Sequence, residues 1–449
     1  MSGLEQVNPA DYKRTEVGII PEDWCVKSLS NCLENERIPS GLYKDKNLYG
    51  NGTSIIKLGD VFGNDFFKPE KVQKVAATKN EISTYKVKIG DLIIALASVK
   101  LDGVGKVMLV DQLTSETIFD HNVALMRFTS DFNPTFMSYM LRSNWVRSLI
   151  ASRATQVGTT FLKTSTILEF EVPLPDISEQ TAIANALSDV DTLLTELEKL
   201  IAKKQAIKTA TMQQLLKGKT RLPQFATYTE GEKQGQTKGT KPSELGEIPE
   251  DWGVKKIGDF TDCTAGGTPS TKVPAYWGGS NPWMSSGELH LKRVFDVAER
   301  ITDLGLTNSS TKYIPKDSIL MGLAGQGKTR GTVAISKIKL CTNQSIAAIF
   351  PSKDHSTEYL FYNLDNRYEE LRSLSTGDGG RGGLNLSIIR SLKIPYPDLE
   401  EQTAIATILS DMDNEIQTVE QRLAKTRQIK QGMMQELLTG RTRLPLNKN

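Results

Sequence analysis

Two stretches of the chain, residues 178–217 and 400–439, carry apolar residues at alternating steps of four and three. This spacing places the apolar side chains on one face of a helix, and neither stretch contains proline. The pattern predicts two long helices with one apolar seam each. The seam residues are Ile183, Leu187, Val190, Leu194, Leu197 and Ile201 in the first helix, and Ile405, Leu409, Met412, Ile416, Val419 and Leu423 in the second.

The rest of the chain shows a different pattern, of short β-branched runs interrupted by Gly, Pro and Asp. Such runs are typical of strands and turns. They occur at 55–60, 88–93 and 126–128, and again at 283–288, 314–319 and 348–350. The sequence therefore predicts an α+β chain, with mixed, mainly antiparallel sheet in the regions that precede the two helices.

The chain is also a tandem repeat. EVGIIPEDW at 16–24 recurs as ELGEIPEDW at 244–252, and PLPDISEQTAIANALSDVD from Pro173 recurs as PYPDLEEQTAIATILSDMD from Pro395. The second similarity continues without a gap to LLKGKTRLP and LLTGRTRLP. A repeat this long indicates a duplicated domain pair rather than a solenoid. The predicted segments are a first module (1–176), a first helix (177–223), a linker (224–244), a second module (245–398) and a second helix (399–445).

The two helices offer the same apolar stripe, so they most simply pack on each other. A helix of forty residues is about 60 Å long. Parallel packing would force the 224–244 segment to return that distance almost fully extended. That segment is polar and rich in Gly, Thr and Lys, which is typical of a flexible linker. We therefore expect an antiparallel pair with one module at each end, related by a pseudo-two-fold axis. Gly218 and Gly440 stand where a helix C-terminus favours glycine.

Composition adds little. The 449 residues carry a net charge of +2 and are 38% hydrophobic, as in a soluble globular protein. The longest apolar run, Leu92–Val99, is too short to cross a membrane, and we expect a cytoplasmic protein without membrane association. The four cysteines have no C-x-x-C spacing, so we interpret them as reduced core cysteines rather than zinc ligands.

The order module, helix, module, helix carries three repeated signatures: G-x-I-P-E-D-W before each module, E-Q-T-A-I-A at each helix start and L-L-x-G-x-T-R-L-P at each helix end. This arrangement resembles the specificity subunit of type I restriction-modification enzymes over nearly the whole chain. The resemblance implies that the modules are target recognition domains, each reading one half of an asymmetric, interrupted DNA sequence. The helices would set the spacer between the halves and dock the partners.

The resemblance also implies the partners and their cofactors. Besides double-stranded DNA, these would be two modification subunits, which methylate adenine, and two restriction subunits with translocase and nuclease activity. S-adenosylmethionine, ATP and magnesium are expected on those subunits, with no cofactor on this chain.

Two nearly identical helix faces offer two equivalent sites for one kind of partner. The candidate partner contacts are repeated polar residues outside the seam. The alternative is that acidic residues in a first helical turn cap the helix and suit its dipole. The candidates are Glu179, Gln180, Asp189 and Asp191 in the first helix, and Glu401, Gln402, Asp411 and Asp413 in the second.

The segment Gly322–Thr329 matches the phosphate-binding pattern G-x-x-x-x-G-K-T. A β-type run follows it, where a phosphate loop needs a helix, so we interpret it as a DNA-contacting loop. A second glycine-rich loop, 377–385, corresponds to 158–163 in the first module. Solvated or mobile surface loops are the alternatives. The candidate DNA contacts are Gln326, Lys328, Thr329, Arg330, Arg381 and Asn385 in the second module, and Lys100, Lys106 and Lys163 in the first.

No catalytic signature accompanies these loops. Asn281-Pro282-Trp283 lacks the second proline of an adenine methyltransferase motif, E-x-K is absent, and the three histidines lie far apart in sequence. We therefore predict a non-catalytic subunit. Two alternatives stay open: a scaffold whose modules bind peptides, and an ATPase that uses the 322–329 loop.

Overall fold

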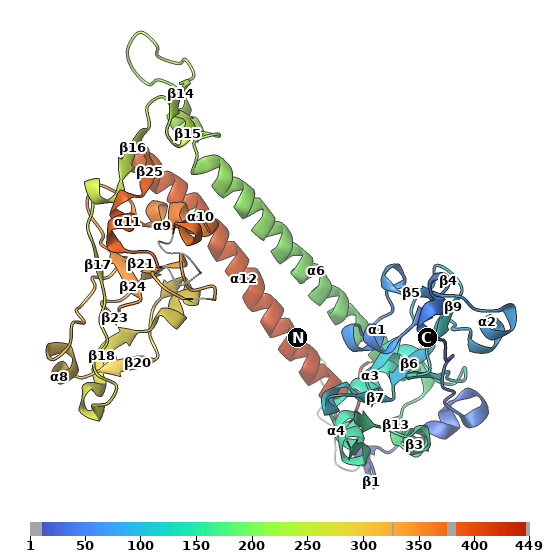
Figure 1. Ribbon diagram of the computed structural model, residues 1–449. Coiled ribbons are helices and arrows are strands. Elements are labelled where there is room, and N and C mark those ends of the chain that lie inside the picture. Colours follow the sequence, from blue (N-terminus) through green and yellow to red (C-terminus); the bar gives the residue numbers. More distant parts are fainter. Residues whose placement is uncertain (1–10, 158, 326, 375–382, 446–449) are drawn as a thin grey trace. The chain divides into compact units, whose positions relative to one another are not determined.

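The computed structural model describes residues 11–157, 159–325, 327–374 and 383–445, and the chain divides into two compact units (Figure 1). Unit 1 comprises Met1–Glu198 together with Gln421–Asn449, and unit 2 comprises Lys199–Glu420. Each long helix therefore contributes one half to each unit. The sequence-based division differs from this one, because it kept each helix as a segment of its own.

Unit 1 combines short strands with short helices before its part of the long helices. Its strands are β1 (Tyr12–Thr15), β2 (Gly18–Pro21), β3 (Cys25–Ser28), β4 (Tyr49–Ile56), β5 (Gln73–Val75), β6 (Leu92–Ala95), β7 (Ala97–Ser98), β8 (Val107–Leu109), β9 (Thr117–Phe119), β10 (Val123–Met126), β11 (Thr155–Val157), β12 (Thr159–Phe161) and β13 (Glu171–Leu174). Its helices are α1 (Leu58–Gly63), α2 (Lys79–Tyr85), α3 (Pro134–Arg142), α4 (Asn144–Arg153), α5 (Thr164–Leu168) and the start of α6 (Ile177–Leu215).

Unit 2 repeats this scheme. Its strands are β14 (Thr240–Ser243), β15 (Gly246–Pro249), β16 (Gly253–Lys256), β17 (Cys263–Ala265), β18 (Trp277–Met284), β19 (Arg293–Val294), β20 (Glu299–Ile301), β21 (Ile319–Gly322), β22 (Val333–Ser336), β23 (Cys341–Thr342), β24 (Ile346–Ile349) and β25 (Lys393–Tyr396). Its helices are α7 (Pro223–Ala226), α8 (Asp303–Thr307), α9 (Thr357–Asp365), α10 (Tyr368–Ser373), α11 (Leu386–Ser391) and the start of α12 (Leu399–Leu437).

The strands form several small sheets in each unit rather than one. Unit 1 has the sheets β10-β6-β8, β5-β4-β9 and β11-β12-β7, and unit 2 has β17-β24-β21-β22-β19 and β20-β18-β23. Most neighbours are antiparallel, and parallel pairs are β4 with β9, β18 with β23 and β19 with β22. The predicted α+β class with mixed, mainly antiparallel sheet is confirmed.

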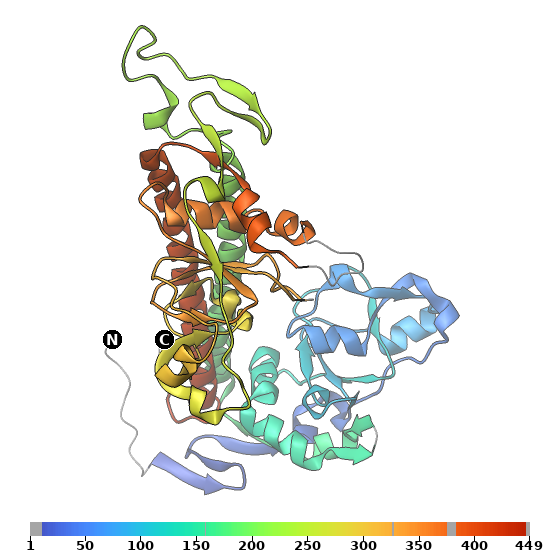
Figure 2. The same ribbon diagram turned by 60° about the vertical axis from the view of Figure 1, so that its left-hand side comes forward.

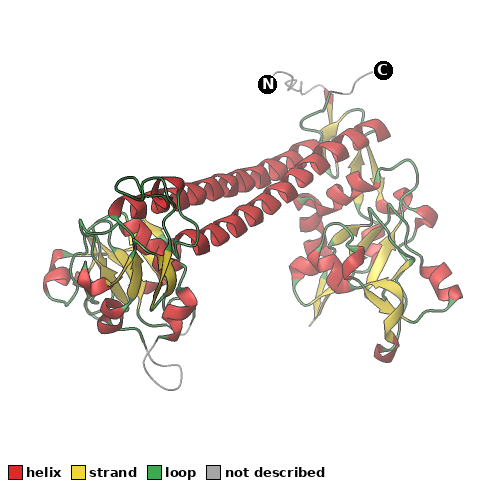
Figure 3. Cartoon of the chain, turned by 90° about the horizontal axis from the view of Figure 1, so that it is seen from above, coloured by secondary structure: helices red, strands yellow, loops and turns green. Residues whose placement is uncertain are grey.

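The two long helices also follow the sequence prediction (Figure 3). The seam residues Ile183, Leu187 and Leu197 of α6 are buried, as are Ile405 and Leu409 of α12. Within each unit the two helix halves run antiparallel. The ion pairs show this, since the residue number of the partner in α12 decreases as the residue number in α6 increases. The pairs are Asp191–Lys430 and Glu198–Arg427 in unit 1, and Lys204–Glu415 and Lys208–Asp413 in unit 2.

Each core encloses the end of the helix that begins in the other unit. In unit 1, Leu437 and Leu438 of the α12 end pack with Trp24 and the α3 residues. In unit 2, Leu215 and Leu216 of the α6 end pack with Trp252 and the α9 residues. The core of each unit therefore contains residues from both repeats.

Both long helices end at a glycine in the left-handed region, as predicted. Gly218 has φ +66° and Gly440 has φ +68°. A Cβ at either position would also lie 2.4 Å from the ring of the proline in I-P-E-D-W, Pro249 and Pro21 respectively. Glycine thus serves both the helix end and its close packing on the repeated motif.

The 224–244 segment differs from the expected flexible linker. It contains α7 and β14, and β14 pairs with β15 in a hairpin that corresponds to β1–β2 (Figure 2). The Glu250 carboxylate ties the segment down, because it accepts hydrogen bonds from Tyr228 Oη and from the Gly239 amide, both at 2.6 Å. The composition of the segment does not predict this structure, because Glu250, which holds the segment in place, lies outside 224–244.

Three of the four cysteines, Cys32, Cys263 and Cys341, are buried free thiols, and burial raises the pKa of Cys32 to about 12. Cys25 is exposed, so its assignment to the core is wrong; it lies on the two-stranded β3–β13 pair. In the described part of the chain, no helix has both the length and the apolar character required to span a membrane.

Candidate nucleic-acid interface

The two modules present equivalent hairpin loops. The 96–106 loop connects β6 to β8 in unit 1, and the 323–332 loop connects β21 to β22 in unit 2. The G-x-x-x-x-G-K-T segment therefore runs from a strand into a second strand. Because a phosphate loop uses the amides at a helix N-terminus, this geometry does not support the ATPase interpretation.

The structure places most candidate DNA residues on these loops. Lys100 and Lys328 are exposed, whereas Lys106, Thr329 and Arg330 are half-buried. Gln326 lies outside the described residues.

The described ends of the second pair of candidate loops lie beside the first loops. The Leu162 amide donates to the Leu96 carbonyl and the Leu384 amide donates to the Leu323 carbonyl, both at 2.9 Å. These bonds join the chain just before Lys163 or Asn385 to the hairpin loop of the same unit. Each module thus brings its two candidate segments together.

Lys163 and Asn385 hold the same position, directly before α5 and α11. Lys163 is exposed. The Asn385 side chain already has a role, because its Oδ1 accepts a hydrogen bond from the Ile388 amide at 2.9 Å and caps α11. Arg381 lies outside the described residues.

Lys106 lines an open cleft of about 840 Å³ in unit 1. Four further cations line it: Lys68, Arg142, Arg147 and Lys430. Arg142 is paired with Asp65 and Lys430 with Asp191, while Lys68 and Lys106 form no ion pair with a described residue. The cleft therefore carries an excess of positive charge.

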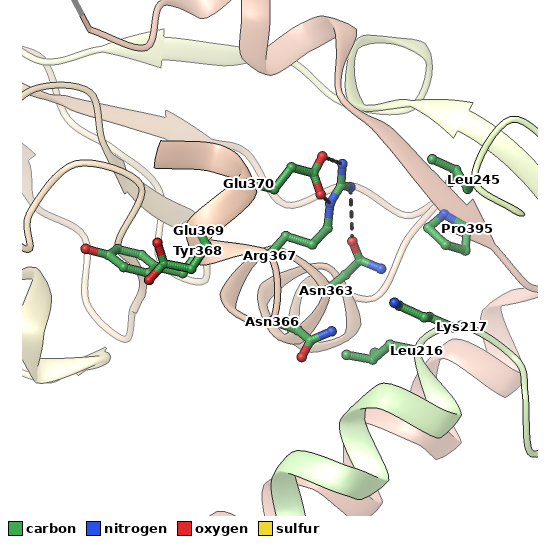
Figure 4. Close-up of a pocket in the computed structure, with 10 residues that line it drawn as sticks. All are labelled: Leu216, Lys217, Leu245, Asn363, Asn366, Arg367, Tyr368, Glu369, Glu370 and Pro395. Carbon is green, nitrogen blue, oxygen red and sulfur yellow. Dashed lines mark hydrogen bonds and ion pairs between the residues drawn. The ribbon is translucent and has the colours of Figure 1, made fainter. Parts of the chain in front are cut away.

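A pocket of about 380 Å³ in unit 2 lies beside the end of α6, lined by Lys217, the turn between α9 and α10, and Leu245 (Figure 4). Its guanidinium, from Arg367, is engaged by Glu370 at 2.5 Å and by the Lys393 carbonyl at 2.8 Å. Because this cation is already neutralised, the pocket has little attraction for a phosphate group.

The repeated motifs meet in a cluster around a buried glutamate, which we call the clamp. In unit 1, Glu179 accepts a hydrogen bond from Trp24 Nε1 at 3.1 Å and two from Arg443 at 2.6 and 2.7 Å. Arg443 also binds Asp23 through two bonds of 2.9 and 2.8 Å. The Arg443 hydrogen bond lowers the pKa of Asp23, and the pKa of Arg443 is raised in turn.

Unit 2 has the same clamp. Glu401 accepts a bond from Trp252 Nε1 at 2.8 Å and two from Arg221 at 2.6 and 2.8 Å, and Arg221 also binds Asp251. In both units the tryptophan and glutamate come from one repeat and the arginine from the other. The end of each long helix therefore completes the other repeat's module.

The candidate partner residues divide into internal and exposed side chains. Glu179, Gln180, Glu401 and Gln402 are each 1% exposed. The two glutamines bind backbone groups on both sides: Gln180 those of Asn133 and Pro175, and Gln402 those of Ser356 and Pro397. These four residues thus have a role inside their own unit.

Asp191 and Asp413 also make internal contacts, accepting hydrogen bonds from Tyr139 and Tyr362, both at 2.7 Å, beside their ion pairs. Asp189 and Asp411 alone among the eight candidates have exposed side chains. Partner contact by any of the eight stays a prediction.

Sequence reasoning missed several residues that organise these sites. Asp176 and Asp398 cap the long helices, since the amides of Glu179 and Glu401 donate to them at 3.0 and 2.7 Å. The repeated P-D before each helix could have identified them. The clamp arginines were visible as the repeated T-R-L-P, but nothing local links them to a distant glutamate.

No group of three or more acidic, histidine or cysteine side chains in the described ranges could hold a metal ion. His355 is buried, and burial lowers its pKa to about 4, so the ring is neutral at physiological pH. Its Nδ1 lies 2.8 Å from Ser352 Oγ. His355 thus has a structural role in the core of unit 2.

A family model described as the type I restriction modification DNA specificity domain matches residues 21–209 and again 249–428. The chain belongs to this family. The two matches coincide with the two repeats, each covering a module and most of the helix that follows it. The modules are accordingly two DNA specificity domains of this family.

One relative matches over nearly the full length, and others match over part of it. The chain is 27% identical over 450 residues to a type I restriction enzyme MjaX specificity subunit of Methanocaldococcus jannaschii, covering 98% of this chain and 99% of the relative. It is 36% identical over 182 residues to the MjaIX specificity subunit of the same organism, covering 39% and 41%.

Solved structures of the family share the fold. The S subunit of a type I restriction-modification system from M. genitalium matches with a TM-score of 0.56 and 14% identity, covering 94% of this chain and 97% of that one. A chain from a study of the assembly and conformational transition of a type I system matches with a TM-score of 0.54, covering 94% and 99%.

Proposed function

We propose that this specificity subunit is non-catalytic and that its two modules read different halves of an asymmetric, interrupted DNA target. The observation that carries the proposal is that both modules share one loop scaffold but present different side chains on it. Lys100 and Lys106 stand on the 96–106 loop, whereas the equivalent 323–332 loop carries Lys328, Thr329 and Arg330. A shared scaffold with different side chains favours a common docking mode and different target bases.

The proposed DNA contacts divide by chemistry. Lys100, Lys106 and Lys163 in unit 1 would bind phosphates and guanine edges, and the basic cleft around Lys106 and Lys68 supports the phosphate contacts. In unit 2, Lys328 and Thr329 would bind the backbone and Arg330 a base edge. Gln326, Arg381 and Asn385 stay proposed contacts, with Asn385 limited by its capping role.

We propose that two methyltransferase subunits dock on the helix pair, one on each equivalent face. The supporting features are exposed side chains repeated 222 positions apart: Asp189 with Asp411, and Ile207 with Ile429. A surface that occurs twice favours two copies of one partner. Restriction subunits would join the same assembly, and S-adenosylmethionine, ATP and magnesium would reside on these partner subunits.

Replacing Arg330 by alanine should weaken DNA binding by about 1–3 kcal/mol. It should relax the base requirement in one half of the target only, so that methylation spreads to sites that differ in that half. The measurement co-expresses the chain with its methyltransferase subunit and maps methylated adenines on otherwise unmethylated genomic DNA. Lys353→Ala, an exposed change in the same unit, is the control. Unchanged methylation at every site in Arg330→Ala would remove this residue from the reading surface.

A further inference from the structure

The two hairpin loops are closed by the same pair of backbone hydrogen bonds. In unit 1, the Ala95 amide donates to the Lys106 carbonyl at 2.9 Å and the Gly105 amide to the Ala95 carbonyl at 2.8 Å. In unit 2, the Gly322 amide donates to Thr332 and the Gly331 amide to Gly322, both at 2.9 Å. The base of each loop is therefore fixed by the sheet.

Each loop also returns against a helix of its own unit. Gly105 and Gly331 have positive φ angles of +69° and +79°. A Cβ at Gly105 would lie 2.8 Å from Ile150 and 3.3 Å from Arg147 on α4, and one at Gly331 would lie 3.3 Å from the Arg372 amide on α10. Glycine lets the end of each loop approach the helix closely.

In each unit an arginine on this helix binds the loop backbone just before the glycine. Arg147 donates to the Val104 carbonyl at 2.7 Å and to the Asp102 carbonyl at 2.8 Å. Arg372 donates to the Gly327 carbonyl at 2.7 Å and to Tyr368 Oη at 2.8 Å, and the Tyr368 hydroxyl donates to the Lys328 carbonyl at 3.3 Å. The two arginines thus play the same part on different loops.

These guanidinium groups donate hydrogen bonds to the loop backbone of their own unit, so they do more than add positive charge to the surface. Burial lowers the pKa of Arg147, which is half-buried beneath the loop. Its donors fork onto two neighbouring carbonyls, a geometry that the single ammonium group of lysine cannot reproduce. The bound carbonyls lie within a few residues of Lys100, Lys106, Lys328 and Arg330.

We propose that Arg147 and Arg372 are positioning residues that hold the 96–106 loop and residues 327–332 of the second loop in the conformation that reads DNA, each governing one half of the target. The proposal rests on the proposed function of these loops. A loop of this length is costly to order from a free ensemble, and base edges discriminate only when donors are held at hydrogen-bond distance. Loss of the arginine would therefore reduce discrimination more than it reduces stability.

The test uses the complex of the full chain with its methyltransferase subunit on unmethylated genomic DNA, with methylated adenines mapped by sequencing. Arg147→Ala should lower discrimination against wrong bases by about tenfold in one half of the target and leave the other half as in the wild type. Arg372→Ala should do the reverse. Arg147→Lys should not restore discrimination, because a single ammonium nitrogen lacks the fork that binds the Val104 and Asp102 carbonyls.

Matched controls lie on the same helices: Arg153→Ala on α4 and Glu369→Ala on α10, both exposed. The melting temperature of each variant is measured in parallel. The proposal is overturned if either arginine variant keeps wild-type discrimination in both halves, or if methylation falls equally at all sites with a matching loss of stability. Failure of the proposed function looks different, since the wild-type complex would then produce no interrupted target at all.

Discussion

Replacing Arg221 by alanine should lower the free energy of unfolding of unit 2 by about 3–5 kcal/mol. The reason is that Glu401, whose side chain is 1% exposed, would keep its charge in a buried place while losing two hydrogen bonds and its ion pair. Trp252 Nε1 would be the remaining clamp donor to that carboxylate. A charged carboxylate that is buried without a cation has a much higher free energy than the same carboxylate in water.

The equivalent change in unit 1, Arg443→Ala, should have a smaller effect, because the Arg443 side chain is 34% exposed against 11% for Arg221. Arg427→Ala is the matched control, since the Arg427–Glu198 pair is exposed on both sides and such pairs contribute about 0–1 kcal/mol. Hydrogen exchange of amides in β16, β25 and the start of α12 reports on unit 2 separately from unit 1. Equal protection in Arg221→Ala and Arg427→Ala would contradict the role of the clamp.

Inserting seven residues into both long helices should change the gap in the DNA target while leaving both half-sequences unchanged. Both helices pass from one unit to the other, between Glu198 and Lys199 in α6 and between Glu420 and Gln421 in α12. An insertion of one heptad at both points keeps the apolar seam in phase. It adds about 10 Å to each helix, which corresponds to up to about 3 base pairs.

Mapped adenine methylation reads this result directly, with the same heptad inserted in α6 alone as the control. The single insertion puts the helix halves out of register, so it should reduce methylation without producing a new target. A double insertion that is active on the original target with its original gap would show that the helices do not set the spacer.

The sequence predicted the long helices well because their signal is local and repeated. Leu187 and Leu409 lie 222 positions apart in equivalent seams, and both are fully buried. The clamp could not be predicted in the same way. Arg443 and Glu179 are separated by 264 positions, and their pairing depends on antiparallel helices that bring the end of one repeat to the start of the other repeat's long helix.

Part of the loop structure could be predicted from the sequence, and part could not. Glycine and lysine content identified the 322–329 segment, and the β-type run after it correctly argued against a phosphate loop. Arg147 and Arg372 escaped notice because each lies on an ordinary short helix, and their contacts with loop carbonyls exist only in the folded module. The polar 224–244 segment misled because Glu250, its anchor, lies beyond it.

The most direct test of the account is the target methylated by the wild-type complex. Co-expression with the methyltransferase subunit in cells that lack other adenine methylation should produce one asymmetric motif: two different short half-sequences separated by a fixed gap of unspecified bases. A single continuous motif, a palindromic one, or a motif that persists when this chain is omitted would contradict the claim that its two modules each read one half.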